Sequence, residues 1–374
     1  LKAILVIPFA IIIFLLFADF TMKGPGNNIL DMSTLLKNEN YVKELNGLWV
    51  KKSKDGFADL VHFDNDRVSF RDGTDISGYY WRMEKGELIL SREKGADGIH
   101  LKAESGSDKL SIWWNDAGGT NYSRSGVENT MDLFLSGQEM KIDLPFISQF
   151  RLLEKQDLVY RICLGFTEDG RPILSFNGEI VKISDIEELV EKERVKHSKL
   201  DVRMLTAMFF VDKNMPMEEV LKVKKELRKI NSLKIADSGY PGSGDLVVSP
   251  LLYHTVAIPR ILPPMDVPVM EKEEVEKKGM KLFTIDLAGR NSNPADIDGD
   301  LEEFLRKNSD EKYVFSLEYD GQIPYGQYME AVDMVFKVVY RFRDELAMKE
   351  YNMHYTELGA NTQKEVRKAF PMVL

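Results

Sequence analysis

The chain has very little of what disulfides and most protein metal sites are made from. Its 374 residues include one cysteine, Cys163, and only five histidines. A single cysteine excludes an intrachain disulfide and leaves a cysteine-based zinc site without enough ligands. The histidines are spread from His62 to His354 without a metal-binding spacing. We therefore predict neither a metal site nor a cofactor.

Positive charge is also scarce. Lys and Arg number 50 against 60 Asp and Glu, the formal net charge is -10, and the basic residues form no cluster. An acidic chain without a basic patch is a poor ligand for a phosphate backbone, so we expect no nucleic-acid partner. Apolar residues make up 44% and charged residues 29%, which excludes a wholly disordered or multi-pass membrane chain.

Catalytic motifs are the third absence. The sequence contains no HExxH, no GxSxG and no Walker loop. The segment at 296–303 has its glycine in the wrong place for a calcium loop. The acid pairs at 187–188 and 302–303 are adjacent and diverge on a helix, and Cys163 is predicted to be a buried, inert thiol. No catalytic residue is predicted, and we do not expect an enzyme.

The one long apolar run lies near the first residue. Residues 3–18 carry no charge and follow Lys2, whose side chain can reach toward a lipid headgroup. The run is shorter than the about 20 residues of a typical membrane span. Cleavage after Ala18 would release the chain to the periplasm, but Leu16 is bulky where signal peptides prefer a small residue. We therefore predict a retained membrane helix in residues 1–20.

A polar linker at 21–42 precedes a region, 43–126, that reads as β-structure. Seven short alternating runs are separated by turn pairs such as Asp-Gly and Gly-Gly, which predicts an antiparallel meander or small barrel. The segment LNGLWV around Trp49 resembles the opening Gly-x-Trp strand of lipocalin-like modules, which implies a ligand pocket. Side chains usually fill the interior of so small a barrel, so a packed core is the alternative.

Two α+β regions follow a connection at 127–155. Residues 156–240 read as β, β, α, β, α, β, with a capping box at Ser184 and Glu187 opening the first helix. A proline-punctuated segment at 241–280 is predicted to be an extended linker. Residues 281–374 then predict a strand at 281–287, a helix at 297–308, a strand at 311–320 and a helix at 324–346. A polar helical tail follows where a last edge strand is expected.

The two regions are an internal repeat. Residues 211–220, VDKNMPMEEV, align with residues 319–328, YDGQIPYGQY, so that Asp212 matches Asp320 and Pro216 matches Pro324. The aspartates are suited to a turn after a strand, and the prolines to the start of a helix. We call residues 156–240 copy one and residues 281–374 copy two.

The repeat resembles the periplasmic domain of the ExbD/TolR family. That family has an Asp-Lys at a strand end and a Pro-Tyr-Gly entering the next helix. The residues of this family pattern are divided between the two copies, and we call them the repeat signature. They are Asp212, Lys213 and Pro216 in copy one and Asp320, Pro324, Tyr325 and Gly326 in copy two. The resemblance implies two-layer α/β sandwiches, dimer formation and a role in biopolymer transport. Residues 3–18 lack the intramembrane aspartate of the proton-coupled members, so we do not predict the proton-motor activity of that family for this chain.

The helix at 327–346 has more apolar surface than a lone domain buries. Its polar residues form one narrow stripe, and most other positions are apolar. This pattern predicts contact with the other copy or the tail, or a homodimer contact.

The sequence therefore predicts an α+β multidomain protein with an N-terminal membrane helix, a small β-barrel or meander and two ExbD-like modules. The predicted function is that of a non-catalytic binding or scaffold protein of the inner membrane, with its domains in the periplasm. The expected partner is an envelope protein or the cell wall. The predicted partner-binding edge is the first strand of copy one, Tyr160, Arg161, Ile162, Cys163 and Leu164.

Two other functions stay open. The segment LKAILVIPFAIIIFLL resembles the last membrane helix of BlaR-type antirepressor metallopeptidases. That resemblance implies an extracytoplasmic sensor whose catalytic part lies upstream. The third hypothesis is a ligand carrier built around the β-barrel.

Overall fold

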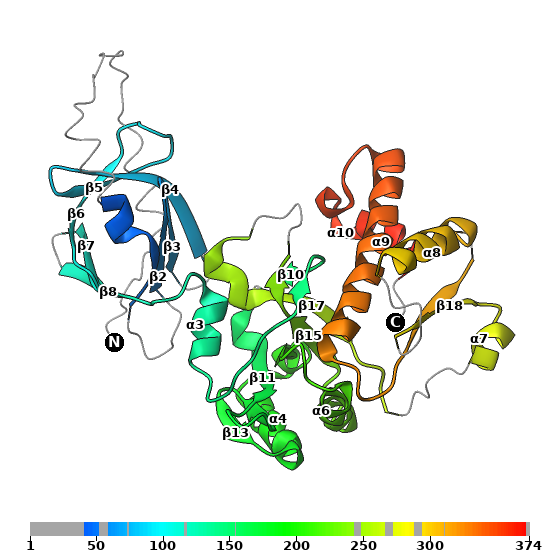
Figure 1. Cartoon of the computed structure of the whole chain (residues 1–374). Helices are drawn as coiled ribbons and strands as arrows, with labels where there is room; N and C mark the ends of the chain where they lie inside the picture. Colours follow the sequence, from blue (N-terminus) through cyan, green and yellow to red (C-terminus); the bar gives the residue numbers. More distant parts are fainter. Residues whose placement is uncertain are drawn as a thin grey trace.

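The computed structural model describes residues 41–51, 59–72, 75–115, 118–153, 155–242, 248–265, 272–287, 294–309 and 311–371. The predicted membrane segment at 3–18 and most of the linker at 21–42 lie outside these ranges. Among the helices that are described, none has the length and hydropathy needed to cross a membrane. The chain is an α+β protein in which an antiparallel barrel precedes further sheets (Figure 1).

The first region is a closed eight-stranded barrel. Each strand pairs with the next, and pairing of Trp49 with Arg124 and of Val50 with Ser123 closes the ring. Of the two predicted alternatives, meander and barrel, the barrel is confirmed. The strands are β1 (Gly47–Val50), β2 (Asp59–Asp64), β3 (Arg67–Asp72), β4 (Asp75–Glu84), β5 (Glu87–Ser91), β6 (Ile99–Ser105), β7 (Lys109–Asn115) and β8 (Gly118–Arg124).

The eighth strand was not among the seven predicted from the sequence. Of its residues, GGTNYSR, only Thr120 and Tyr122 favour strands, and Tyr122 is the residue of this strand that is buried. Tertiary contacts hold it instead. The Arg124 guanidinium lies 4.3 Å from the ring centroid of Trp49 and donates to the backbone carbonyls of Asn46 and Glu44. Arg124 thus adds side-chain contacts to the strand pairing that closes the barrel.

Side chains fill the interior of the barrel. Trp49, Phe63, Val61 and Leu88 are each at most 1% exposed, and Trp81 packs edge-on against Phe63 at 5.0 Å between ring centroids. This is the packed alternative that small barrels favour.

Copy one forms most of a seven-stranded mixed sheet with the order β10-β17-β15-β14-β11-β12-β13. The flanking residues add β10 and β17, and from here on these two strands are counted with copy one. Its centre is parallel: β11 pairs with β14, and β14 with β15. The strands are β10 (Arg151–Leu152), β11 (Val159–Phe166), β12 (Pro172–Phe176), β13 (Glu179–Val181), β14 (Thr206–Val211), β15 (Lys234–Ser238) and β17 (Val256–Ile261). Its helices are α4 (Ile186–Arg194), α5 (Lys199–Val202) and α6 (Met217–Lys229).

Both faces of this sheet are covered. Apolar residues of α4 and α6, such as Val190 and Val223, pack on one face with Phe209. On the other face, α3 (Thr130–Ser136) packs with Phe134 against Phe210 at 4.4 Å between ring centroids. The connection at 127–155 therefore adds a third layer, where the sequence predicted a two-layer sandwich. It also pairs β9 (Phe146–Ile147) with β16 (Tyr240–Pro241).

The prediction that residues 241–280 form an extended spacer is wrong for its middle part. Residues 250–255 form a 3-10 helix, η3 (Pro250–Thr255), and β17 then joins the main sheet. Pro259 favoured the prediction of a linker here, because proline is rare in strands. It lies opposite Ala236, beyond the two residues at which β17 meets β10, so its missing N–H breaks no ladder bond.

Copy two repeats only the centre of this arrangement. Strand β18 (Lys281–Asp286) pairs in parallel with β19 (Tyr313–Glu318), and these two strands form a separate sheet. The helices α8 (Pro294–Lys307) and α9 (Tyr325–Tyr351) cover one face, where the Phe304 ring lies 5.1 Å from that of Phe283. A short helix, α7 (Lys272–Lys277), precedes β18; the tail forms η4 (Tyr355–Glu357) and α10 (Ala360–Ala369).

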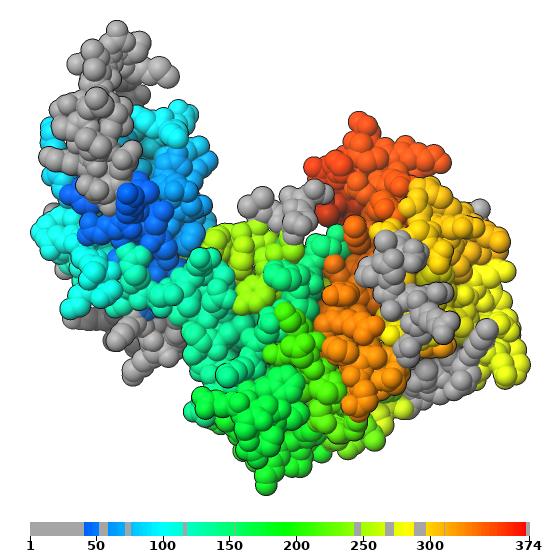
Figure 2. Space-filling view, in the orientation of Figure 1, coloured from blue at the N-terminus to red at the C-terminus, as the bar shows by residue number. Residues whose placement is uncertain are grey.

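The long helix α9 joins the two copies. One hydrophobic core contains Phe209 and Val223 of copy one together with Val332 and Val335 of α9. The Asp333 carboxylate accepts hydrogen bonds from the backbone N–H groups of Ser148 and Gln149. The apolar surface predicted for a homodimer contact is thus buried within the chain. In Figures 1 and 2, α9 lies between the two copies, and the barrel meets copy one along one side.

Candidate functional site at the junction of the two repeats

The repeat signature begins in each copy with an aspartate turn. Oδ1 of Asp212 accepts a hydrogen bond from the backbone N–H of Asn214, and Oδ1 of Asp320 accepts one from Gln322, both at 2.8 Å. These are equivalent positions of the repeat. Asp212 also accepts from the N–H of Asp143 at 2.8 Å, which connects its turn to the segment covering the second face. The predicted turn role of both aspartates agrees with this geometry.

The two turns face each other and exchange backbone hydrogen bonds. The N–H of Met217 donates to the carbonyl of Ile323 at 3.0 Å, and that of Tyr325 donates to Met215 at 2.8 Å. Further along, the N–H of Glu218 donates to Gly321 at 2.8 Å, and that of Gly326 donates to Lys213 at 2.7 Å. Each hydrogen bond donated by copy one to copy two has an equivalent bond donated by copy two to copy one. Pro216 lies opposite Pro324 at the centre. The copies are therefore related by a local pseudo-two-fold axis.

This exchange has a clear physical reason. The first N–H groups of a helix have no partner within the helix. The prolines remove one donor each, and the opposite copy accepts from the next two donors of α6 and of α9. Gly326 is required for the close approach, because a Cβ there would lie 3.0 Å from both the carbonyl oxygen and the Cβ of Lys213. The Lys213 side chain turns outward and pairs with Asp143 at 2.8 Å.

Beside the junction lies a buried group of charges. Asp237, at the end of β15, is 0% exposed. Its carboxylate pairs with Nζ of Lys224 at 3.2 Å and accepts from Nε of Arg260 at 2.8 Å and from the hydroxyl of Tyr325 at 2.8 Å. Arg260 also donates to the hydroxyl of Tyr328 at 2.6 Å. Residues of α6, β15 and β17 in copy one thus meet the first turn of α9.

The electrostatics keep this carboxylate ionised. Burial raises the pKa of a carboxyl group, but the charges of Arg260 and then Lys224 outweigh it and lower the pKa of Asp237 to about 2. The pKa of Tyr325 is raised well above its ordinary value, first by burial and then by the Asp237 charge, so its hydroxyl stays a donor. These groups satisfy one another, and the arrangement holds α9 on copy one.

The sequence contains a weak signal for this network in Lys224. Lys224 follows Val223 on the buried face of α6 and interrupts an apolar stripe. Asp237 ends a predicted strand, but Arg260 lies in the segment predicted to be a linker. A lysine within an apolar helix face implies a buried acidic partner, because an unpaired buried charge is costly.

The predicted partner-binding edge is wrong. Residues Tyr160 to Leu164 lie in β11, which has β14 on one side and β12 on the other. Tyr160, Ile162 and Cys163 are each 0% exposed, and burial raises the pKa of the Cys163 thiol to about 12. The parallel partner β14 comes from later in the chain, so the order of strands along the sequence did not reveal that β11 is internal.

A second polar junction fastens the barrel to copy one. Arg71 of β3 donates to Nε2 of His254 at 3.1 Å and to the carbonyl of Leu251 at 3.3 Å. Because arginine can only donate, Nδ1 of His254 carries the proton, and it meets the Thr130 hydroxyl at 2.8 Å. Burial, followed by the charges of Arg71 and Arg161, lowers the pKa of His254 to about 3. Leu48 and Leu60 of the barrel wall pack on Leu251 beside it.

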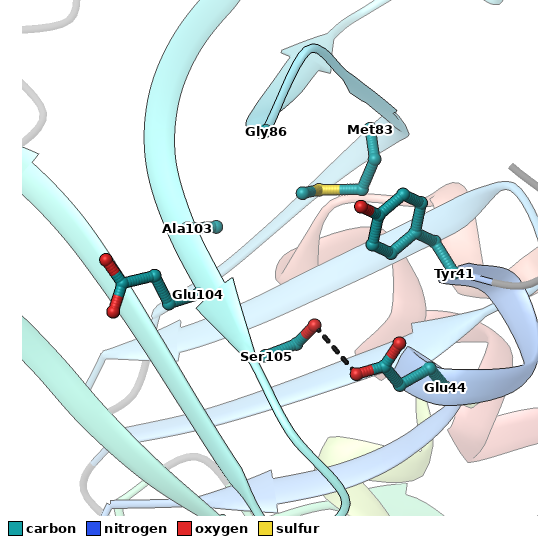
Figure 3. Close-up of a pocket in the computed structure, with 7 residues that line it drawn as sticks. All are labelled: Tyr41, Glu44, Met83, Gly86, Ala103, Glu104 and Ser105. Carbon is teal, nitrogen blue, oxygen red and sulfur yellow. Dashed lines mark hydrogen bonds between the residues drawn. The ribbon is translucent and has the colours of Figure 1, made fainter. Parts of the chain in front are cut away.

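The barrel mouth holds a shallow hollow of about 360 Å³, lined by Tyr41, Glu44, Met83, Gly86, Ala103, Glu104 and Ser105 (Figure 3). Tyr41 and Met83 point toward each other across it, while Glu104 turns away. The Ser105 hydroxyl donates to Glu44 at 3.0 Å. Met83 belongs to the filled interior, so the hollow does not lead into a lined cavity. Among the described residues, no group of three or more acidic, His or Cys side chains is placed to hold a metal ion.

The junction of the repeats is thus the most extensively built polar site of the described chain. It combines crossed backbone bonds with a buried ion network, and both join two halves of one sequence. Comparison with known proteins gives no further guide, since the chain matches no family model, no curated protein and no solved structure.

Proposed function

We propose that the protein is a non-catalytic scaffold of the cell envelope, in which two ExbD-like modules form an internal pseudodimer that binds an envelope partner. Residues 3–18 would anchor it in the inner membrane, with the described domains in the periplasm. The observation that carries the proposal is the reciprocal hydrogen bonding of the two signature turns. The family that the repeat resembles is dimeric, and here two modules of one chain make a symmetric contact.

The site chemistry supports binding rather than turnover. Asp237, Lys224 and Arg260 are used to hold α9 on copy one, and the Asp212 and Asp320 carboxylates cap turns. The proton-motor activity of the family is not part of the proposal. The barrel contributes a rigid body that Arg71 and His254 hold against copy one.

Cell fractionation tests the location. The chain expressed in a Gram-negative host should sediment with the inner membrane and be cut by protease added to spheroplasts. A chain lacking residues 1–20 should no longer sediment. A membrane-bound chain that protease cannot reach would contradict the proposal.

A deletion strain of the source organism tests the role. Loss of the gene should weaken the envelope barrier, measured as sensitivity to bile salts and to vancomycin. The intact chain should restore the barrier. Gly326→Val, which forces the two turns apart, should not, whereas Glu44→Gln at the barrel mouth should restore it. Full rescue by Gly326→Val, in a variant shown to be disturbed at the junction, would overturn the pseudodimer as the working unit.

A further inference from the structure

The sheet of copy two ends on a strand edge whose backbone groups point outward. The N–H of Lys281 donates to the carbonyl of Lys312, and that of Leu287 donates to Glu318, both at 2.8 Å. In a parallel ladder, alternate residues face the neighbouring strand. The even-numbered residues of β19 therefore face β18, and the N–H and C=O groups of Tyr313, Phe315 and Leu317 face away. Within the described residues, no strand pairs with that side of β19.

Copy one shows what occupies the equivalent edge. There the N–H of Asp212 donates to the carbonyl of Leu164 in β11, so the odd-numbered residues of β14 face the other way. On that side lies β15, in parallel, with Ala207 opposite Ile235 and Phe209 opposite Asp237. The repeat alignment puts Phe315 and Leu317 of β19 at the positions of Ala207 and Phe209. The edge of β19 is therefore the position that β15 fills in copy one.

The described part of the tail does not supply that strand. In copy one, α6 has 13 residues and the chain returns to the sheet as β15. In copy two, α9 has 27 residues, and the tail folds back on its far end. Arg343 donates to the carbonyl of Phe370 at 2.7 and 2.9 Å, and Asp344 accepts from the N–H of Tyr355 at 2.8 Å. Within the described ranges, the position that β15 fills in copy one therefore has no equivalent strand beside β19.

An isolated pair of parallel strands is also an uncommon structure. Parallel sheets are normally larger and covered on both faces, and two strands alone are marginally stable. In copy two, one face carries the aromatic residues Phe283, Tyr313 and Phe315 beneath α8 and α9. The other face carries Leu282, Thr284, Val314, Ser316 and Glu318, which are exposed or half-buried. An added strand would therefore need apolar side chains on the face beneath the helices, whereas the other face is only partly covered.

We propose that the outer edge of β19 binds an extended segment of a partner polypeptide, in parallel with β19 and with apolar residues at alternate positions. This rests on the proposed binding function and names its site. Apolar side chains of the segment would extend the aromatic layer under α8 and α9. Backbone bonds to Tyr313, Phe315 and Leu317 would hold it.

Directed disulfide formation between two cysteines, with diamide added as the two-electron oxidant, tests the site in the full chain. The native thiol does not compete, since Cys163 is 0% exposed and its pKa is about 12. A cysteine is introduced as Ser316→Cys on the half-buried face of β19. The probe is a synthetic peptide of residues 231–239, with Asp237→Val to remove the buried charge and one cysteine placed at each position in turn. The matched control is Thr284→Cys, on the same face of the sheet but in β18.

The register of the reaction identifies the pairing. In copy one, Met208 lies opposite Ala236, and the repeat equivalent of Met208 is Ser316. The peptide with Ala236→Cys should therefore react fastest with Ser316→Cys, by about tenfold over Thr284→Cys, because pairing raises the local thiol concentration. Peptides with the cysteine one residue to either side should react at the rate of the control. Hydrogen exchange of the Phe315 and Leu317 amides should slow when the peptide is bound.

Equal reaction of both protein variants, without protection of β19, would overturn the site. Disulfide-linked dimers of Ser316→Cys formed without peptide would assign the edge to a second copy of the chain and overturn the assignment to a partner polypeptide. The result is independent of the envelope test. If the peptide reacts in the expected register but the deletion strain keeps an intact envelope, the edge is retained and the scaffold function is refuted. If the envelope is weakened but the reaction shows no register, the scaffold function is retained and the edge is refuted.

Discussion

Copy one and copy two share a strand–helix–strand–helix core but complete it differently. In copy one, the parallel strands β11 and β14 have strands on both sides and layers on both faces. In copy two, β18 and β19 have only each other within the described residues, and helices cover one face. The repeated motif therefore specifies the parallel pair and its helices. The strands that enlarge the sheet of copy one lie outside this motif: β12, β13 and β15 within residues 156–240, β10 in residues 127–155 and β17 in residues 248–265.

The copies also place their charges differently. Copy one buries Asp237 with Lys224 and Arg260. Copy two has its comparable cluster on the surface, where Arg341 of α9 pairs with Asp298 at 3.2 Å and also with Glu302 of α8. Buried charges fix one arrangement of elements and are costly when unpaired, whereas exposed pairs contribute little. The junction is thus specified mainly from copy one.

The largest effect should come from removing the buried charge of copy one. Asp237→Ala leaves Lys224 and Arg260 without their counterion and should lower the unfolding free energy by about 3–5 kcal/mol. Asp298→Ala in copy two is the control, and it should cost less than about 1 kcal/mol. All four tryptophans lie in the barrel, so tryptophan fluorescence reports barrel unfolding, and circular dichroism reports the helical copies. A similar loss of unfolding free energy in both variants would contradict the difference between the buried charges of copy one and the exposed charges of copy two.

The covered second face of copy one should matter almost as much. Phe210 is 0% exposed and packs on Phe134, so Phe210→Ala should cost about 3–4 kcal/mol through lost packing and a cavity. Its repeat equivalent, Glu318, is exposed, and Glu318→Ala should change stability by less than about 0.5 kcal/mol. Urea unfolding followed by circular dichroism measures both. A neutral Phe210→Ala would show that the third layer does not support the sheet.

The contact of the barrel with copy one through His254 should make stability depend on pH. The folded-state pKa of His254 is lowered to about 3, while the unfolded value is near 6.5. The unfolded chain then binds the extra proton between these values, so this contribution to stability is complete above pH 6.5 and falls as pH drops toward 3. The loss amounts to a few kcal/mol across that window. His254→Gln should flatten this part of the pH profile of the urea midpoint, whereas the exposed His100→Gln should not.

The smallest expected effect is the difference in stability between substitutions at Gly326 and at Gly321, which lie on opposite sides of the pseudo-two-fold contact. A Cβ at Gly326 would meet backbone and side-chain atoms of Lys213 at 3.0 Å, whereas one at Gly321 would meet Cβ of Glu218 at 3.2 Å. Gly326→Val should therefore cost about 1–3 kcal/mol, and Gly321→Val less. Thermal unfolding by circular dichroism is the measurement. A larger loss of stability for Gly321→Val would mean that the packing of Gly321 against Glu218 is tighter than that of Gly326 against Lys213.

Local patterns in the sequence predicted much of the fold. The helix at 186–194 has apolar residues at helical spacing, the strand at 206–211 is an apolar run, and the strand at 313–318 alternates between buried and more exposed residues over most of its length. The signature turns were found because two short segments of one chain resemble each other. Their mutual contact was not predicted, because a repeat gives positions that are equivalent but does not say that those positions touch.

What the sequence did not show depends on distant partners. Strand β8 is held by its Arg124 packing on Trp49 of β1, and β17 tolerates Pro259 because its pairing with β10 ends at Ala257. The Asp237 network joins residues from three elements of copy one to α9. The internal position of β11 depends on β14, which lies forty residues further along. Each depends on tertiary pairing, which propensity and periodicity do not report.

The crossed hydrogen bonds between the signature turns also determine stoichiometry. Two identical subunits meeting in this way would duplicate every surface feature, so each would appear twice in the assembly. In one chain the same contact joins two sequences that differ, and each feature outside the contact occurs once. Within the described residues, the unfilled position beside β19 then occurs once per molecule, at a fixed one-to-one ratio with the barrel. Equilibrium binding to the intact chain should therefore saturate at one equivalent of an edge-binding segment.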